Sequence, residues 1–134
     1  MFLKVEHIGI AVKNLNEANT LIAKLFDKNF YKQESVERES VTTSFFQIGE
    51  TKIELLEATK NDSAISKFIE KKGEGIHHLA FEVADIRSEM KRLESLGFQL
   101  LSKEPLIGAD NKIICFLHPK TTNGILVELC QEIK

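Results

Sequence analysis

Two histidines and two glutamates recur at matching places in the two halves of the sequence. His7 opens the segment His-Ile-Gly-Ile-Ala-Val, and His78 opens the similar segment His-Leu-Ala-Phe-Glu-Val. Each half then reaches a glutamate flanked by apolar residues, Glu54 in the first half and Glu128 in the second. Histidine and glutamate are 47 positions apart in the first half and 50 in the second. This matched spacing predicts two copies of one supersecondary unit.

The alternation of side chains along a strand places these four residues on the sheet face that is turned away from the covering helices. Successive residues of a strand point to opposite faces of the sheet. The apolar neighbours of each histidine and glutamate would face the covering helix, and the polar side chain would face the other way. We therefore expect His7, Glu54, His78 and Glu128 to line the concave side of curved sheets.

Two imidazoles with one or two carboxylates form a ligand set that suits Fe(II), Mn, Co, Ni or Zn. The carboxylates lower the net charge of such a site without saturating it, which leaves positions open for a chelating substrate. A lone histidine on a strand is more often structural than a ligand, so the prediction depends on the recurrence of the pair. The sequence thus predicts one divalent metal site, with His7, Glu54, His78 and Glu128 as candidate ligands.

Three further residues carry reactive or ligating groups. Cys130 has the same parity as Glu128 and is expected near the site as a small buried side chain, while Cys115 is expected in the core. His77 has the opposite parity to His78 and is expected at the surface or in an interface.

Length and composition limit the classes of protein that fit. The chain has 134 residues, 43% of them hydrophobic and 28% charged, which suits one domain with its own core. No apolar run approaches the roughly 20 residues of a membrane span. The net charge of −2, with both signs interspersed, argues against a non-specific nucleic-acid binder. No secretory or transit signal is recognised and two cysteines give no disulfide framework, so a cytoplasmic protein is expected.

Helix signals separate the strands in both halves. Asn14 is predicted to cap a helix, with Glu17 three residues on, and Asp85 to cap another that ends at Gly97. A shorter helix is predicted over 63–71, followed by a glycine-rich hinge to residue 75. The apolar face of the first helix is expected to contain Ala18, Leu21, Ile22, Leu25 and Phe26.

The predicted strands complete an α+β domain. They cover residues 5–12, 41–48, 52–57, 76–83, 98–101, 112–117 and 124–130. Strand, helix and further strands, repeated twice, predict two βαβββ modules that form curved sheets around a cavity. The modules are expected at about 3–60 and 74–132, with a helix and hinge at 61–75 between them.

Five segments carry a resemblance to a known family. They are Glu6 to Val12, Lys52 to Glu57, Gly73 to His78, Phe116 to Lys120 and Gly124 to Cys130. With these segments the sequence resembles the methylmalonyl-CoA epimerases of the vicinal oxygen chelate superfamily, which also includes glyoxalase I and extradiol dioxygenases. The likeness covers nearly the whole chain.

The resemblance implies a fold, a reaction and roles for residues. It implies the vicinal oxygen chelate fold and the interconversion of (R)- and (S)-methylmalonyl-CoA through an enolate of the thioester. His7, His78 and Glu128 would bind the metal, and Glu54 would complete or flank that set. Glu128 would also be the acid/base group on one face of the enolate. The implied partners are an acyl-CoA thioester and a second copy of the chain in a homodimer, with no nucleic acid or membrane.

The sequence departs from the family pattern where the second acid/base group is expected. Alignment on Val41 puts Arg38 where many relatives have an acidic residue, with Glu39 one place later. Glu39 is favoured as the second catalytic residue, Glu37 is the alternative, and a plain charged loop is the third possibility. Asp110 stands where many epimerases have a histidine.

Two other functions remain open at this point. A glyoxalase I-like isomerase would use similar metal ligands, although no cluster of arginines for glutathione is evident. A metal-free binding protein of the same fold would not need all four polar residues. A dioxygenase is disfavoured because the chain is short and lacks a second pair of modules.

Overall fold

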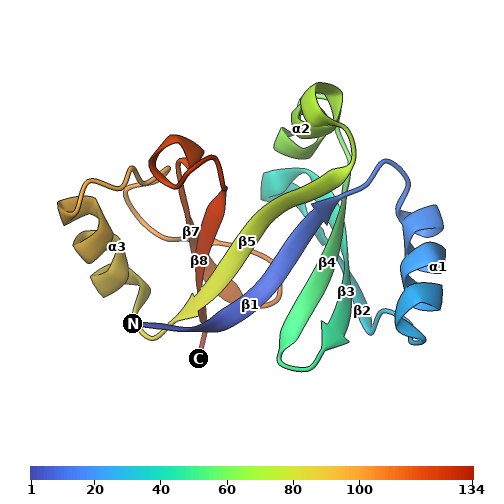
Figure 1. Ribbon diagram of the computed structural model, residues 1–134, viewed down its shortest axis with the longest axis horizontal. Coiled ribbons are helices and arrows are strands. Elements are labelled where there is room, and N and C mark those ends of the chain that lie inside the picture. The colour runs from blue at the N-terminus through green and yellow to red at the C-terminus, as the bar shows by residue number, and fades with distance from the viewer. The chain divides into compact units, whose positions relative to one another are not determined.

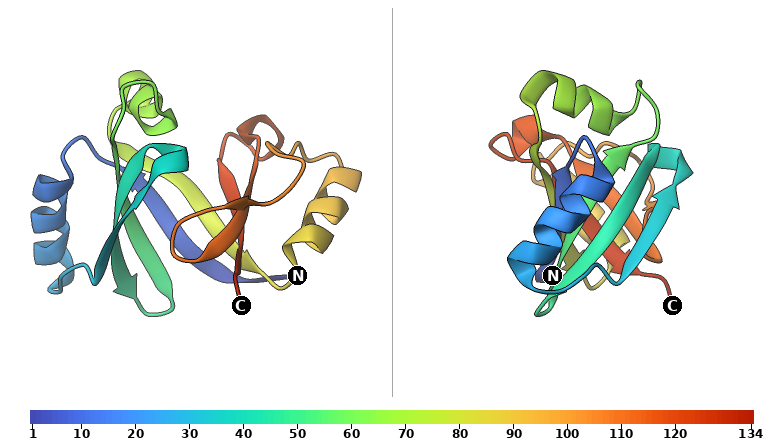
Figure 2. Two further views of the ribbon diagram at one scale, coloured as in Figure 1. Left: turned by 180° about the vertical axis from the view of Figure 1, so that it is seen from behind. Right: turned by 90° about the vertical axis from the view of Figure 1, so that its right-hand side faces the viewer.

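The computed structural model describes residues 1–134, which divide into two units. One unit comprises residues 8–77, and the other comprises residues 1–7 together with 78–134. Strands β1 (Phe2–Ala11) and β5 (Gly75–Val83) run through both units, because the boundaries fall within these strands. Figure 1 shows the elements along the chain, and Figure 2 shows them from behind and from the side.

The order of elements confirms the predicted α+β class. Three α-helices accompany an eight-stranded mixed sheet, and the chain runs β1-α1-β2-β3-β4, then α2, then β5-α3-β6-β7-β8. Each half therefore has the βαβββ order that the internal repeat predicts. None of the helices has the length and apolar character needed to cross a membrane.

The unit of residues 8–77 contains three consecutive antiparallel strands, with one helix before them and one helix after them in the sequence. Its elements are α1 (Leu15–Phe26), β2 (Lys32–Val36), the 3-10 helix η1 (Glu37–Glu39), β3 (Val41–Ile48), β4 (Thr51–Ala58) and α2 (Ala64–Lys72). The hydrogen-bonded order is β2-β3-β4-β1. Glu54 of β4 lies directly opposite Phe45 of β3.

Side-chain caps begin both helices of this unit, and the cap at Asn14 is the one that the sequence predicts. The Asn14 side chain accepts a hydrogen bond from the Glu17 backbone N–H at 2.9 Å, and Ser63 caps α2 in the same way. Helix α1 packs against a core that includes Phe46 and Leu55. Because side chains alternate, the neighbours of these two residues point away from α1, and Glu54 is one of them.

The predicted apolar face of α1 is partly wrong. Leu21 is 62% exposed and Leu25 is 71% exposed. Ile22 and Phe26 do pack against the core, but Leu15 and Asn19 are the buried residues of the helix. The buried face of α1 thus includes the polar Asn19, which apolar periodicity cannot predict, and leaves out Leu21 and Leu25.

The unit of residues 1–7 and 78–134 has a parallel strand pair at its centre. Its further elements are α3 (Ile86–Ser95), β6 (Leu106–Ile107), β7 (Lys112–Leu117), the 3-10 helix η2 (Pro119–Thr121) and β8 (Val127–Glu132). The order is β1-β5-β8-β7-β6, with β8 parallel to β5 and antiparallel to β7. Ala80 and Phe116 lie on either side of Glu128 in register.

The two faces of these strands have different neighbours. Asp85 caps α3, as predicted, and the helix packs its Ile86, Met90 and Leu93 against one face. That face also contains the predicted core residue Cys115. A separate small cluster of Ala80, Ile114 and Cys130 covers the opposite face, to which Glu128 also belongs by alternation.

Three strand predictions differ from the structure. No strand was predicted at 32–36, where β2 forms the edge next to β3. The predicted strand 98–101 reduces to a single bridge between Leu100 and Leu117, and the edge strand β6 lies at 106–107 instead. Strand β8 starts at Val127 rather than at residue 124. All three lie at edges or ends, where pairing is short and the sequence pattern is weak.

Candidate metal centre

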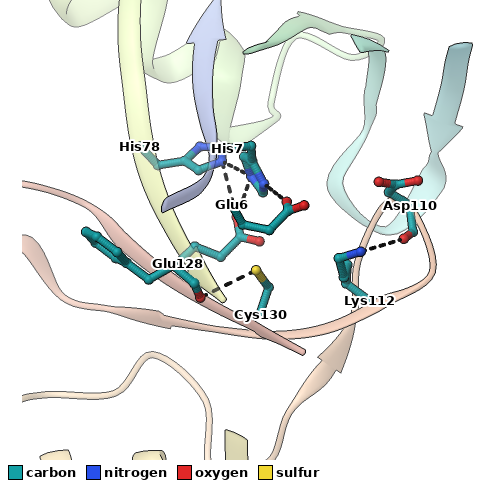
Figure 3. Close-up of polar contacts among 8 residues, drawn as sticks. Glu6, His7, His78, Asp110, Lys112, Glu128 and Cys130 are labelled. Atoms are coloured by element: carbon teal, nitrogen blue, oxygen red, sulfur yellow. Dashed lines mark hydrogen bonds and ion pairs between the residues drawn. The ribbon is translucent and has the colours of Figure 1, made fainter. Parts of the chain in front are cut away.

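Three side chains of the unit 1–7 and 78–134 converge on one point (Figure 3). The Nε2 atoms of His7 and His78 are 3.0 Å apart. Glu128 Oε1 lies 3.5 Å from Nε2 of His7 and 3.1 Å from Nε2 of His78. All three residues are buried, with 5–6% of their surface exposed. The structure thus brings together the three predicted metal ligands that belong to this unit.

The strand register explains this convergence. His7, His78 and Glu128 come from β1, β5 and β8, which are adjacent in the sheet order. Ala80 lies directly opposite Glu128 and has a small side chain, so it leaves space on the face shared with His78. The Phe116 ring meets the His78 ring edge-on at 5.7 Å and so fixes its orientation.

The three separations fit the donors of a single divalent ion. Metal bonds from nitrogen and oxygen are about 2.0–2.2 Å long, so neighbouring donors around one ion lie roughly 3.0–3.5 Å apart. The observed distances of 3.0, 3.1 and 3.5 Å fall in that range. Two histidines and one carboxylate are also the donor types of sites that keep positions open for substrate. The donor set is therefore suited to a divalent metal.

Glu6 supports one of the histidines from behind. Its Oε1 lies 2.7 Å from Nδ1 of His7, and only 3% of Glu6 is exposed. The contact assigns the ring proton to Nδ1, which leaves the lone pair of Nε2 directed at the other donors. Carboxylates commonly hold metal-ligating histidines in this way. Glu6 is not among the residues predicted for the site, because strand alternation assigns it to the face opposite His7. The glutamate directly before the histidine is the sequence signal that could have indicated it.

The electrostatics keep the Glu128 carboxylate charged. Burial alone would raise the pKa of this carboxyl. Electrostatic attraction to His7, together with hydrogen bonds with His7 and His78, outweighs burial and holds the pKa of Glu128 far below its usual range. Glu128 is thus an anionic donor at neutral pH.

Cys130 lies on the same face as Glu128, beside the three converging side chains. Its thiol donates a hydrogen bond to the backbone oxygen of Phe81 at 3.4 Å. Burial and the nearby carboxylates of Glu128 and Glu6 raise the pKa of the thiol well above its usual value. Cys130 is not among the converging donors and fills space beside the cluster as a small buried side chain, as predicted.

The remaining predicted site residues belong to the unit of residues 8–77. Glu54 is buried on β4, with 4% of its surface exposed, on the face turned away from α1. Glu39 is half-buried in η1, whereas Glu37 and Arg38 of the same turn are exposed. The roles of Glu39 and Glu54 stay predictions. His77, expected at a surface or interface, is half-buried and meets the Phe68 ring edge-on at 5.0 Å.

Comparison with known proteins places the chain in a family. A model of the glyoxalase/bleomycin resistance protein/dioxygenase superfamily matches residues 6–116. The chain belongs to this superfamily. Within this glyoxalase superfamily, it is 39% identical to the ethylmalonyl-CoA/methylmalonyl-CoA epimerase of Cereibacter sphaeroides, over 98% of this chain and 99% of that protein.

Two further relatives match this chain over nearly its whole length. It is 40% identical to the uncharacterized protein YqjC of Bacillus subtilis, over 96% of this chain and 91% of that protein. Among solved structures, a variant of the Streptomyces coelicolor methylmalonyl-CoA epimerase in complex with 2-nitronate-propionyl-CoA has a TM-score of 0.96 and 31% identity, with each chain fully covered. These glyoxalase superfamily relatives confirm the predicted fold and the predicted family.

Proposed function

We propose that this chain is a metal-dependent epimerase that interconverts (R)- and (S)-methylmalonyl-CoA. The observation that carries the proposal is the convergence of His7, His78 and Glu128 within 3.5 Å of one another. This cluster occurs in a chain that is 39% identical, over nearly its full length, to a relative named for this activity. Other similar structures carry a CoA thioester, including an epimerase in complex with methylmalonyl-CoA.

His7, His78 and Glu128 would hold the divalent metal, and Glu54 would complete or flank this set. Co, Mn, Ni, Zn and Fe all suit two imidazoles and a carboxylate. When bound, the ion supplies a Lewis acid that stabilises the negative charge developing on the substrate oxygens as the α-proton leaves. Glu6 keeps the His7 ring oriented, so that Nε2 of His7 would be available to hold the ion.

Epimerisation requires an acid/base group on each face of the planar enolate. One group removes the α-proton while the group on the opposite face delivers another, and the roles reverse in the opposite direction. Glu128 is assigned to one face, because its buried carboxylate lies beside the proposed metal donors His7 and His78. Glu39 is assigned to the other face. Its partial burial supports this assignment over Glu37, which is exposed.

The activity is tested with the metal-loaded protein and two substrates. The protein is incubated with (S)-methylmalonyl-CoA, and the R epimer is followed by chiral analysis of the thioester. A parallel sample receives the methylglyoxal–glutathione adduct. The proposal predicts formation of the R epimer and no conversion of the adduct. Isomerisation of the adduct without epimerisation would instead assign the chain to the glyoxalase I reaction.

Two features of the protein in the cell stay predictions. We expect a homodimer, and the exposed apolar side chains of Leu21 and Leu25 on α1 support an interface at that helix. Light scattering of the purified protein, with a Leu21→Lys/Leu25→Lys variant for comparison, measures the assembly. A cytoplasmic location is expected as well.

A further inference from the structure

Lys112 is an unusual residue in the unit that contains the candidate metal centre. Only 7% of it is exposed. Apart from the histidines, it is the only basic residue among the buried charged residues, and the others are Glu6, Glu54, Glu89 and Glu128. Lysines are almost never fully buried unless their charge is paired. The position of Lys112 therefore requires an explanation.

The protein itself gives the Lys112 ammonium little compensation. Its hydrogen-bond partner is the backbone oxygen of Asp110, at the long distance of 3.5 Å. Lys112 forms no salt bridge, although several carboxylates of this unit do, including those of Glu89 and Glu128. Glu132 lies opposite Lys112 in the β7–β8 register, and Glu6 and Glu128 act on the same Cys130 thiol as Lys112, but none of these carboxylates forms an ion pair with it. An anionic ligand would therefore give the buried ammonium a direct partner.

The backbone around Lys112 is fixed by the β6–β7 turn. The Gly108 N–H donates a hydrogen bond to the Lys112 backbone oxygen at 2.9 Å. Asn111 both accepts from the Ile133 N–H and donates through its side chain to the Ile133 oxygen, each at 3.0 Å. The turn thus holds Lys112 in place at the start of β7.

Lys112 shares a sheet face with the candidate metal centre. In the register of β7 and β8, Ile114 lies opposite Cys130 and Phe116 lies opposite Glu128. Lys112 belongs to the same alternating set as Ile114 and Phe116, and Figure 3 draws it together with Cys130 and Glu128. Lys112 lies four residues, or about 14 Å along the strand, from Phe116. An extended anionic ligand could therefore reach both Lys112 and the candidate metal centre.

We propose that Lys112 binds an anionic oxygen group of the acyl-CoA substrate, either the acyl carboxylate or a phosphate of CoA. This inference rests on the proposed function. The metal centre binds the reacting end of the substrate, and the Lys112 ammonium forms a charge-assisted hydrogen bond with the anion. Lys112 is thereby a substrate-binding residue.

The test compares Lys112→Met with the wild type in the metal-loaded enzyme. A hydrogen bond to a charged group contributes about 1.5–3 kcal/mol, so KM should rise roughly 10–100-fold. The kcat should stay close to that of the wild type, because the substitution weakens the binding of the substrate and of the transition state equally. Lys112→Arg, which keeps the charge, should restore most of the affinity. Lys91→Met, at an exposed position of α3, is the control and should change neither constant.

A substrate without phosphates distinguishes the two anions. If Lys112 binds the acyl carboxylate, Lys112→Met raises KM for methylmalonyl-CoA and for methylmalonyl-pantetheine alike. If it binds a CoA phosphate, only the KM for methylmalonyl-CoA rises. An unchanged KM for both substrates, in a variant that melts at the wild-type temperature, overturns the inference. Lys112→Gln serves the same comparison if Lys112→Met does not fold.

Calorimetry separates this inference from the proposed function. If the wild type does not epimerise methylmalonyl-CoA, the proposed function fails. The affinities of wild type and Lys112→Met for methylmalonyl-CoA still test the anion site, because binding needs no turnover. Weaker binding by the variant supports the site, and equal binding refutes it.

Discussion

The Nε2 atom of His7 lies 3.0 Å from the Nε2 atom of His78, and the two rings are nearly perpendicular at 87°. Glu6 holds the other ring nitrogen of His7 at 2.7 Å. Two imidazole lone pairs that converge in a buried place repel each other unless a proton or a metal ion lies between them. With Glu128 Oε1 completing the triangle, this relationship favours a shared cation.

Replacing His78 with alanine should abolish metal retention. The substitution removes one of three converging donors, so the loss of affinity should exceed the roughly 10–100-fold that changes outside the ligand shell cause. Metal analysis of the purified protein after dialysis measures the effect. His77→Ala removes the neighbouring histidine, which packs on Phe68, and should retain the metal. A His78→Ala protein with full metal content and turnover would show that His78 is not a ligand.

Replacing Glu6 with glutamine should weaken metal binding without abolishing it. The amide is a poorer acceptor for the Nδ1 proton of His7, so the ring is less basic and less well oriented. We expect the dissociation constant for Co²⁺ to rise about 10–100-fold, measured by competition with a chelator. Glu132→Gln, at an exposed position of β8, is the matched control. Equal affinity of Glu6→Gln and wild type would exclude a supporting role for Glu6.

Substitution of the half-buried Glu39 and of the exposed Glu37 should have different effects on the kinetics. Glu39→Gln should lower kcat by about 10²–10⁴, because one face of the enolate loses its acid/base group. Metal content should not change, since Glu39 is not among the proposed ligands. Glu37→Gln should leave kcat near the wild-type value. The reverse result would transfer the acid/base role to Glu37, and two fully active variants would remove both residues from the mechanism.

The contacts of the Glu89 carboxylate predict that the folding stability of the protein depends on pH. The side chain of Arg92 donates to its carboxylate at 3.0 and 3.2 Å, and the α-amino group of Met1 lies 3.0 Å away. The hydrogen bond from Arg92 lowers the pKa of Glu89 below its usual 4.5, against the opposing effect of burial. This stabilisation is fully present above pH 4.5 and is lost as the pH falls through the lowered pKa of the folded protein.

Glu89→Gln should therefore destabilise the protein only where the carboxyl is ionised. We expect a loss of about 1 kcal/mol in the free energy of unfolding near neutral pH. Well below pH 4.5 the difference from the wild type should disappear. Denaturant unfolding at the two pH values measures it, with Glu94→Gln on the exposed side of α3 as control. A deficit that persists in acid would assign the effect to packing rather than to charge.

Strand alternation and the internal repeat were sufficient to predict much of the site. They place the side chains of His78 and Glu128 on the face opposite the α3 core, as the structure confirms. Alternation depends only on backbone geometry, so it survives without knowledge of which strands pair. The parallel register that sets Ala80 opposite Glu128 involves residues 48 positions apart, and no local pattern indicates it.

The missed features depend on tertiary contacts. Glu6 is buried beside His7, although alternation predicts opposite faces for the two residues. Leu21 and Leu25 are exposed because the packing of α1 selects a neighbouring stripe of the helix. Lys112 looks like any surface lysine in the sequence, and only the fold shows that it is buried. Local propensity cannot predict such burial, because it depends on which elements pack around the residue.

The most direct measurement is the exchange of the substrate α-proton in D₂O, followed by NMR with methylmalonyl-CoA and the metal-loaded protein. Deuterium should enter the α-position as one epimer converts into the other, and removal of the metal with a chelator should stop both processes together. Epimer conversion that continues unchanged after the metal is removed, or a metal-loaded protein that exchanges no α-proton, would contradict a metal-assisted enolate reaction at His7, His78 and Glu128.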